Sequence, residues 1–253
     1  MIYNQQHFLL QFSRTCSSLI TKSRKDEFIK QFTSISQILK QEEEDTSNPT
    51  TLRRFPDGDI RRKSGDCSVL VPLVDIGNKT HLIYTQRSMS MRTHKGQICF
   101  PGGRLDSNET WEMAALREAE EEINLKSHDI DVWTPMKPIA DRSMRDTITP
   151  IVGQVINPDA IKNFHSVTEE VDVVIAVPIV ELVTNHDYTF LNFKVALKIP
   201  YYESEFFKVL YSKQDNYTRP DSYRIWGITG VITHQFLLYF APEMYKSKVD
   251  SPF

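Results

Sequence analysis

The sequence lacks the features that identify several classes of protein. Its three cysteines, Cys16, Cys67 and Cys99, lie far apart with no C-x-x-C pair, so neither a disulfide framework nor a thiolate zinc site is expected. The longest apolar run covers only residues 236–241, whereas a membrane-spanning helix needs about 18 residues. Lysine and arginine number 30 against 33 acidic residues, which gives no strong positive field for nucleic acid. We therefore expect a globular protein with no membrane span and no nucleic-acid partner.

Glycine is scarce as well, and its few copies are unevenly placed. The chain has nine glycines, and Gly96, Gly102 and Gly103 fall within eight residues of one another. Because glycine has no Cβ, it allows the backbone to approach a ligand closely. With Pro101, these glycines predict a ligand-contacting loop directly before a helical segment.

That helical segment contains an unusually high number of acidic residues. Glu118, Glu121 and Glu122 stand at positions i, i+3 and i+4, so their side chains share one helix face. Like charges at these spacings destabilise a helix by about 0.2–0.5 kcal/mol per pair, and Arg117 offsets only part of this. A solvated acidic face is one interpretation. A site for a hard divalent cation is the other, since carboxylate oxygens are ligands for Mg²⁺ and Mn²⁺, and the glycine loop favours it.

The same passage resembles the Nudix box, G-x5-E-x7-R-E-U-x-E-E-x-G-U, in which U is a bulky aliphatic residue. The matching residues are Gly103, Glu109, Arg117, Glu118, Glu121, Glu122 and Leu125. Two positions depart from the pattern. Asn124 replaces the last glycine, and asparagine tolerates the same left-handed conformation. Ala119 is small for the aliphatic position.

The resemblance implies a Nudix hydrolase, which uses Mg²⁺ or Mn²⁺ to cleave a nucleoside diphosphate linked to another group. Glu118 and Glu122 match the metal ligands, and Glu121 matches a further ligand or the base that activates water. Arg117 would orient the glutamates, and Glu109 would support the loop. The implied fold is α/β (α+β), with a mixed β-sheet sandwiched between helices and the active site at the loop–helix junction.

The segment just upstream, from Tyr84 to Gly103, is similar to the signature of the coenzyme A diphosphatase branch of that family. The coinciding residues are Thr85, Arg87, Ser88, Arg92, His94, Gly96, Gln97, Ile98, Phe100, Pro101, Gly102 and Gly103. This resemblance implies hydrolysis of coenzyme A or acyl-CoA to 3',5'-ADP and (acyl-)4'-phosphopantetheine. A pyrophosphatase for NADH or ADP-ribose is one alternative, and a non-catalytic ligand-binding Nudix module is another.

Four cationic or ionisable side chains of this segment are candidates for substrate binding. Arg87, Arg92, His94 and Lys95 fall within nine residues, and coenzyme A carries both a pyrophosphate and a separate 3'-phosphate that such groups can bind. Together with Gly102 and Gly103 of the loop, they form the expected substrate site. The open alternative is that the arginines pair with the box glutamates and that His94 is a structural, hydrogen-bonding residue.

Short strands are expected on both sides of the central helix. They cover residues 69–74, 81–85, 151–155, 171–177 and 190–199, with a hairpin turn at Gly77-Asn78 between the first two. Later helices are expected to begin near Glu203 and Ile225. Trp226 is expected in the core, and stacking on an adenine is the alternative.

Composition divides the chain into three parts. Residues 63–245 are expected to form the Nudix domain, followed by a tail over residues 246–253. Residues 1–62 form an N-terminal extension, with a helix to about residue 40 and an acidic linker over residues 41–50. Residues 1–25 contain no acid but are basic and rich in hydroxyls, the composition of a mitochondrial transit peptide; an ordinary amphipathic helix is the alternative.

The last three residues are Ser-Pro-Phe rather than the Ser-Lys-Leu signal of peroxisomal proteins. A mitochondrial location is therefore expected ahead of a peroxisomal or cytosolic one.

Overall fold

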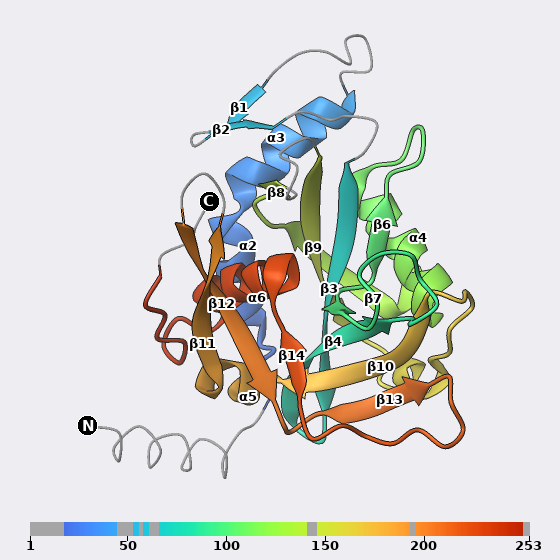
Figure 1. The fold of residues 1–253 in the computed structure, drawn as a ribbon. Helices are drawn as coiled ribbons and strands as arrows, with labels where there is room; N and C mark the ends of the chain where they lie inside the picture. Colours follow the sequence, from blue (N-terminus) through green and yellow to red (C-terminus); the bar gives the residue numbers. More distant parts are fainter. Residues whose placement is uncertain are drawn as a thin grey trace.

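The computed structural model of the chain describes residues 18–44, 53–55, 58–60, 66–140, 146–192 and 196–249. Its centre is a mixed sheet with helices on both faces (Figure 1), as the sequence predicted. None of the described helices is long and apolar enough to cross a membrane.

Six strands form the main path of the sheet, in the order β13-β10-β4-β3-β9-β7. Their bounds are β3 (Cys67–Ile76), β4 (Lys79–Arg87), β7 (Ile130–Pro135), β9 (Thr147–Val155), β10 (Val171–Pro178) and β13 (Lys208–Ser212). β3 and β9 run parallel, and the other neighbours on this path are antiparallel. The short strands β5 (Ile98–Cys99), β6 (Gly102–Arg104) and β8 (Ile139–Ala140) pair with β4, β3 and β9.

The β3–β4 hairpin turns where the sequence predicted. Gly77 and Asn78 have φ angles of 59° and 60°, the left-handed pair that a two-residue type I′ turn requires. Side chains alternate across the two strands, because successive residues of a strand point to opposite faces. Val71 and Leu73 lie in one core and Leu70 in the other, so the sheet is buried on both faces.

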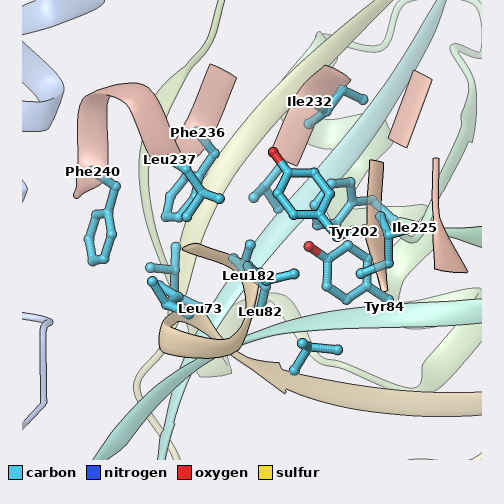
Figure 2. Packing of buried hydrophobic residues seen from close by; sticks show 14 of the residues in the cluster. Leu73, Leu82, Tyr84, Leu182, Tyr202, Ile225, Ile232, Phe236, Leu237 and Phe240 are labelled. Atoms are coloured by element: carbon cyan, nitrogen blue, oxygen red, sulfur yellow. The ribbon is translucent and has the colours of Figure 1, made fainter. Parts of the chain in front are cut away.

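One face is covered by α2 (Lys22–Gln31), α5 (Ile179–Thr184) and α6 (Gly227–Phe240), and the other by α4 (Trp111–Ile123). Figure 2 shows the first core, in which Phe236 and Phe240 of α6 lie near Leu73 and Leu82 of the sheet. The second core holds Ala119 and other small residues of α4, which let this helix lie close to β3.

The N-terminal helices belong to this packing. The expected helix is divided at Phe32 into α2 and α3 (Thr33–Glu44), so helical structure runs beyond residue 40 into the expected acidic linker. Phe28 is fully buried against the rings of Trp133, Phe236 and Phe240, with centroid distances of 6.1, 5.6 and 6.3 Å. Residues 1–17 of the expected targeting segment and residues 45–50 of the linker lie outside the described residues.

A second sheet of three strands stands beside the first. It is formed by β11 (His186–Asn192), β12 (Ala196–Ser204) and β14 (Tyr223–Ile225), in that order, and α6 packs on β12. The hairpin of β1 (Arg53–Phe55) and β2 (Gly58–Ile60) is separate. Two short 3₁₀ turns, Ser127–Asp129 and Ala160–Asn163, complete the described elements.

Two expectations about this region were wrong. A helix was expected near Glu203, but Glu203 is a strand residue paired with Arg224 of β14, because pairing across the sheet overrides a short local pattern. Trp226 was expected in the core, but it is 42% exposed, because it precedes α6 as its N-cap residue instead of lying on the buried helix face.

Candidate active site

The loop and helix of the predicted site are built as the sequence indicated. The hydroxyl of Thr110 caps α4 by accepting from the amide of Met113 at 3.1 Å, an arrangement that stabilises a helix start. Asn124 ends the helix in the left-handed conformation, with φ of 59°. The asparagine therefore fills the backbone role that glycine has at this point of the Nudix box.

Two glycines of the loop permit close packing. A Cβ on Gly103 would overlap Oε1 of Glu118, and a Cβ on Gly102 would overlap the carbonyl oxygen of Ser68. Gly102 thus lets β6 lie against β3, and Gly103 lets the carboxylate of Glu118 reach the loop. Their expected contact with substrate stays a prediction.

Arg117 ties the loop to the helix. Its Nε donates to Oε1 of Glu109 at 2.7 Å and its Nη2 to Oε2 of Glu109 at 3.1 Å. Nη2 also donates to the carbonyl of Arg104 at 3.0 Å. These bonds lower the pKa of Glu109 and raise that of Arg117, so both remain charged. These contacts are consistent with the expectation that Glu109 supports the loop.

The same guanidinium contacts two of the three clustered glutamates. Nη1 of Arg117 donates to Oε1 of Glu118 at 3.0 Å and to Oε2 of Glu121 at 3.3 Å. Glu121 has a half-exposed side chain, whereas that of Glu118 is 18% exposed. Burial raises the pKa of Glu118 in spite of the arginine.

Glu122 lies deepest in the site. It is 4% exposed, and its Oε2 is buried with no hydrogen-bond partner. Burial, followed by the charge of Glu118, raises its pKa to about 8, while Arg87 and a hydrogen bond from the amide of Gly102 act in the opposite direction. A buried carboxylate oxygen without a partner is costly, and a cation relieves that cost.

These residues fit a divalent cation held by two carboxylates. Across the described ranges, no group of three or more His, Cys, Asp or Glu side chains is arranged to hold a metal ion. Mg²⁺ is commonly bound by one or two carboxylates, with water and substrate phosphates as its other ligands. Glu118 and Glu122, with the unpartnered oxygen of Glu122, supply that donor set, while Glu121 lies farther toward solvent.

Three candidate substrate-binding residues lie on the loop between β4 and β5, which folds back on its own ends. The amide of Gly96 donates to the carbonyl of Arg87, and the amide of Arg87 to the carbonyl of Gln97, each at 3.0 Å. Arg92, His94 and Lys95 are exposed on this loop. His94 has a positive φ of 56°, and its Nδ1 lies 2.9 Å from Oε1 of Gln97, which agrees with a hydrogen-bonding residue.

Arg87 is the candidate that the structure brings to the glutamates. Its side chain is 22% exposed, and it lowers the pKa of Glu122. Its ion pair is with Glu170, at 3.5 Å between Nη2 and Oε2, and not with a glutamate of the box. Nothing in the sequence assigned Glu170 a role in the site. The sequence shows only a carboxylate just before a strand. The partner of that strand in the sheet depends on long-range register.

Comparison with known proteins agrees with this geometry. The model of the NUDIX domain matches residues 68–184. "Nudix hydrolase 3" of Caenorhabditis elegans is 35% identical over 180 residues, which cover 71% of this chain and 75% of that protein. "Mitochondrial coenzyme A diphosphatase NUDT8" of Mus musculus is 29% identical over 199 residues, covering 76% of this chain and 86% of that protein.

Solved structures resemble the chain more weakly. The "Crystal Structure of a C. elegans Ap4A Hydrolase Binary Complex" covers 46% of this chain and 80% of that chain, with 18% identity and a TM-score of 0.38.

Proposed function

The chain belongs to the Nudix family of hydrolases, which act on phosphoric anhydrides, and we propose that its substrates are coenzyme A and acyl-CoAs. The products would be 3',5'-ADP and 4'-phosphopantetheine or its acyl derivative. One observation carries the proposal: the loop whose sequence resembles the coenzyme A diphosphatase signature is anchored at Arg87, the residue whose charge lowers the pKa of Glu122.

Two properties of coenzyme A match the residues around the site. Its pyrophosphate needs charge compensation next to the scissile bond, and Arg87 is a cationic side chain near the glutamate pair that is not bonded to a carboxylate of the box. Its 3'-phosphate is a second, separate anion, for which the exposed Arg92, His94 and Lys95 are available. Charge-assisted hydrogen bonds of this kind are stronger than neutral ones. The coenzyme A diphosphatase among the relatives supports the same substrate class.

In the proposed reaction the acidic residues have separate tasks. Glu118 and Glu122 would hold a divalent cation, Mg²⁺ or Mn²⁺, which when bound would offset the charge of the pyrophosphate and lower the pKa of the attacking water. Oε2 of Glu121 faces Arg117, so its Oε1 is the oxygen that accepts the proton of the attacking water. Arg117 fixes Glu118 and Glu121 relative to the loop, and Glu109 fixes Arg117. Water adds to one phosphorus, and the bridging oxygen leaves with the other phosphate.

A substrate panel tests the proposal. Purified protein with Mg²⁺ or Mn²⁺ is incubated with coenzyme A, acetyl-CoA, NADH and ADP-ribose, and the products are identified by mass. We expect 3',5'-ADP from both coenzyme A species, with kcat/KM at least about tenfold above the other two substrates. Intact coenzyme A alongside rapid cleavage of NADH or ADP-ribose would overturn the substrate assignment.

We also propose a mitochondrial location. The support is the acid-free basic N-terminus together with the relative that is named a mitochondrial enzyme. A targeting segment of residues 1–25 would end inside α2, which begins at Lys22 and whose Arg24 pairs with Glu243 at 2.7 Å. A processed form that keeps this helix intact would therefore start before Lys22. Imaging of the tagged full-length chain, with N-terminal sequencing of the mature protein, tests this. A diffuse cytosolic pool that retains Met1 would contradict it.

A further inference from the structure

Glu170 lies where β10 begins, next to the end of β4. The antiparallel register brings Val171 opposite Arg87. The amide of Ser88 donates to the carbonyl of Glu170 at 2.7 Å. The backbone of Glu170 is therefore fixed at the point where the cationic loop leaves β4, outside the Nudix box.

Its side chain is the acidic partner of Arg87. Oε2 of Glu170 lies 3.5 Å from Nη2 of Arg87, and Nε of Arg87 is buried without a hydrogen-bond partner. Arg87 also opposes the burial that raises the pKa of the Cys99 thiol. The carboxylate of Glu170 is the charged group that orients Arg87.

The charges of both members of this pair act on the glutamate pair of the box. The charge of Glu170 contributes to the raised pKa of Glu118 and of Glu122, and the charge of Arg87 opposes the rise at Glu122. Arg117, the other arginine of the site, is already bonded to carboxylates of the box. Arg87 is instead paired with a carboxylate outside the box.

We propose that Glu170 is a positioning residue that holds the guanidinium of Arg87 beside Glu118 and Glu122, where it meets the pyrophosphate of the substrate. A guanidinium is a planar fork of donors, so an ion pair at one Nη restrains the side chain and leaves the other Nη for phosphate oxygens. Glu170 acts through Arg87 and does not itself touch the phosphate or the cation. The inference rests on the proposed function.

A double-mutant cycle tests this. Steady-state kinetics with coenzyme A are measured for the wild type, Glu170→Gln, Arg87→Gln and the double variant, together with the Kd for 3',5'-ADP and for Mn²⁺ by calorimetry. We expect Glu170→Gln to raise KM and the Kd for 3',5'-ADP about 3- to 10-fold, with kcat changed less than about twofold, since a partly exposed ion pair has a modest effect. In the Arg87→Gln background the same change has no further effect.

The matched control is Glu169→Gln, which removes the neighbouring carboxylate whose partner is Lys213 and should leave KM unchanged. Thermal unfolding shows whether each variant is folded. Equal effects of Glu170→Gln in both backgrounds would overturn the proposal. So would weaker Mn²⁺ binding by Glu170→Gln, which would make Glu170 a metal ligand. If the wild type cleaves another phosphoanhydride instead, the proposed function fails, while the cycle run on that substrate still tests Glu170.

Discussion

At the scale of single residues, the carboxylate of Glu122 lies where a negative charge is costly. It is 4% exposed, and one of its oxygens has no hydrogen-bond partner. The nearby carboxylate of Glu118 adds repulsion. A fold that only needed stability would place an apolar residue here, since an unpaired buried charge costs several kcal/mol. The arrangement would become favourable if the two carboxylates held a cation.

Glu118→Gln tests that account through activity. The amide keeps the shape of the side chain but supplies no charge to a cation, so turnover should fall about 100-fold or more. The folded state should persist, because burial already disfavours the charge of Glu118. Glu112→Gln, an exposed change in the first turn of the same helix, is the control and should keep wild-type turnover. Steady-state rates on coenzyme A decide between these outcomes.

His81 gives the protein a pH dependence outside the site. Its side chain is buried, and burial lowers its pKa to about 4 from 6.5. Because the unfolded state takes up a proton first as the pH falls, His81 lowers stability between about pH 6.5 and pH 4. The loss should reach up to about 2 kcal/mol between pH 7 and pH 5. Urea unfolding at several pH values should show a shallower dependence for His81→Gln than for the wild type; parallel curves would contradict this.

At the scale of elements, the loop and helix of the site follow from local chemistry. The capping hydroxyl of Thr110 and the left-handed Asn124 fix both ends of α4. The side-chain amide of Asn124 also donates to the backbone carbonyl of Asn163 at 3.2 Å, so this residue joins α4 to the segment after β9.

Asn124→Ala measures the cost of that helix end. Alanine is strained at a positive φ, so we expect a loss of about 1–2 kcal/mol in the free energy of unfolding. Asn124→Gly should stay within about 0.5 kcal/mol of the wild type, because glycine adopts this conformation freely. Equal losses for the two variants in urea unfolding would show that the side-chain bond to Asn163, and not the backbone conformation, determines stability.

Local sequence patterns predicted these elements. The features that the local patterns did not predict depend on long-range packing. The hairpin turn at Gly77, the helix of the box and its end at Asn124 depend on residues near in sequence, so the sequence was sufficient. Glu170 reaches the site only through the register of β10 on β4. The strand at Glu203 likewise depends on partners distant in sequence. Neither register is encoded in a short motif.

At the scale of the whole molecule, the N-terminal helix completes the core. Composition suggested an extension separate from the domain, yet Phe28 lies among aromatic rings of α6 and β7. Lys25 also pairs with Asp131 of β7 at 2.5 Å. The amphipathic pattern predicted a helix correctly, but it could not indicate which surface the apolar face covers.

Phe28→Ala should therefore destabilise the whole protein. Truncating a fully buried phenylalanine costs about 3–5 kcal/mol, and unfolding should stay a single transition because α2 and the sheet share one core. Glu27→Ala, an exposed change on the same helix, should cost less than about 0.5 kcal/mol. A loss below about 1 kcal/mol for Phe28→Ala in chemical unfolding would mean that α2 is only loosely attached.

The most direct measurement is calorimetric titration of Mn²⁺ into the wild type and Glu122→Gln. Wild-type protein should bind the ion with measurable heat, and Glu122→Gln should bind it at least about tenfold more weakly. Identical isotherms for the two proteins, or no binding by the wild type, would contradict a cation site formed by the buried glutamate pair.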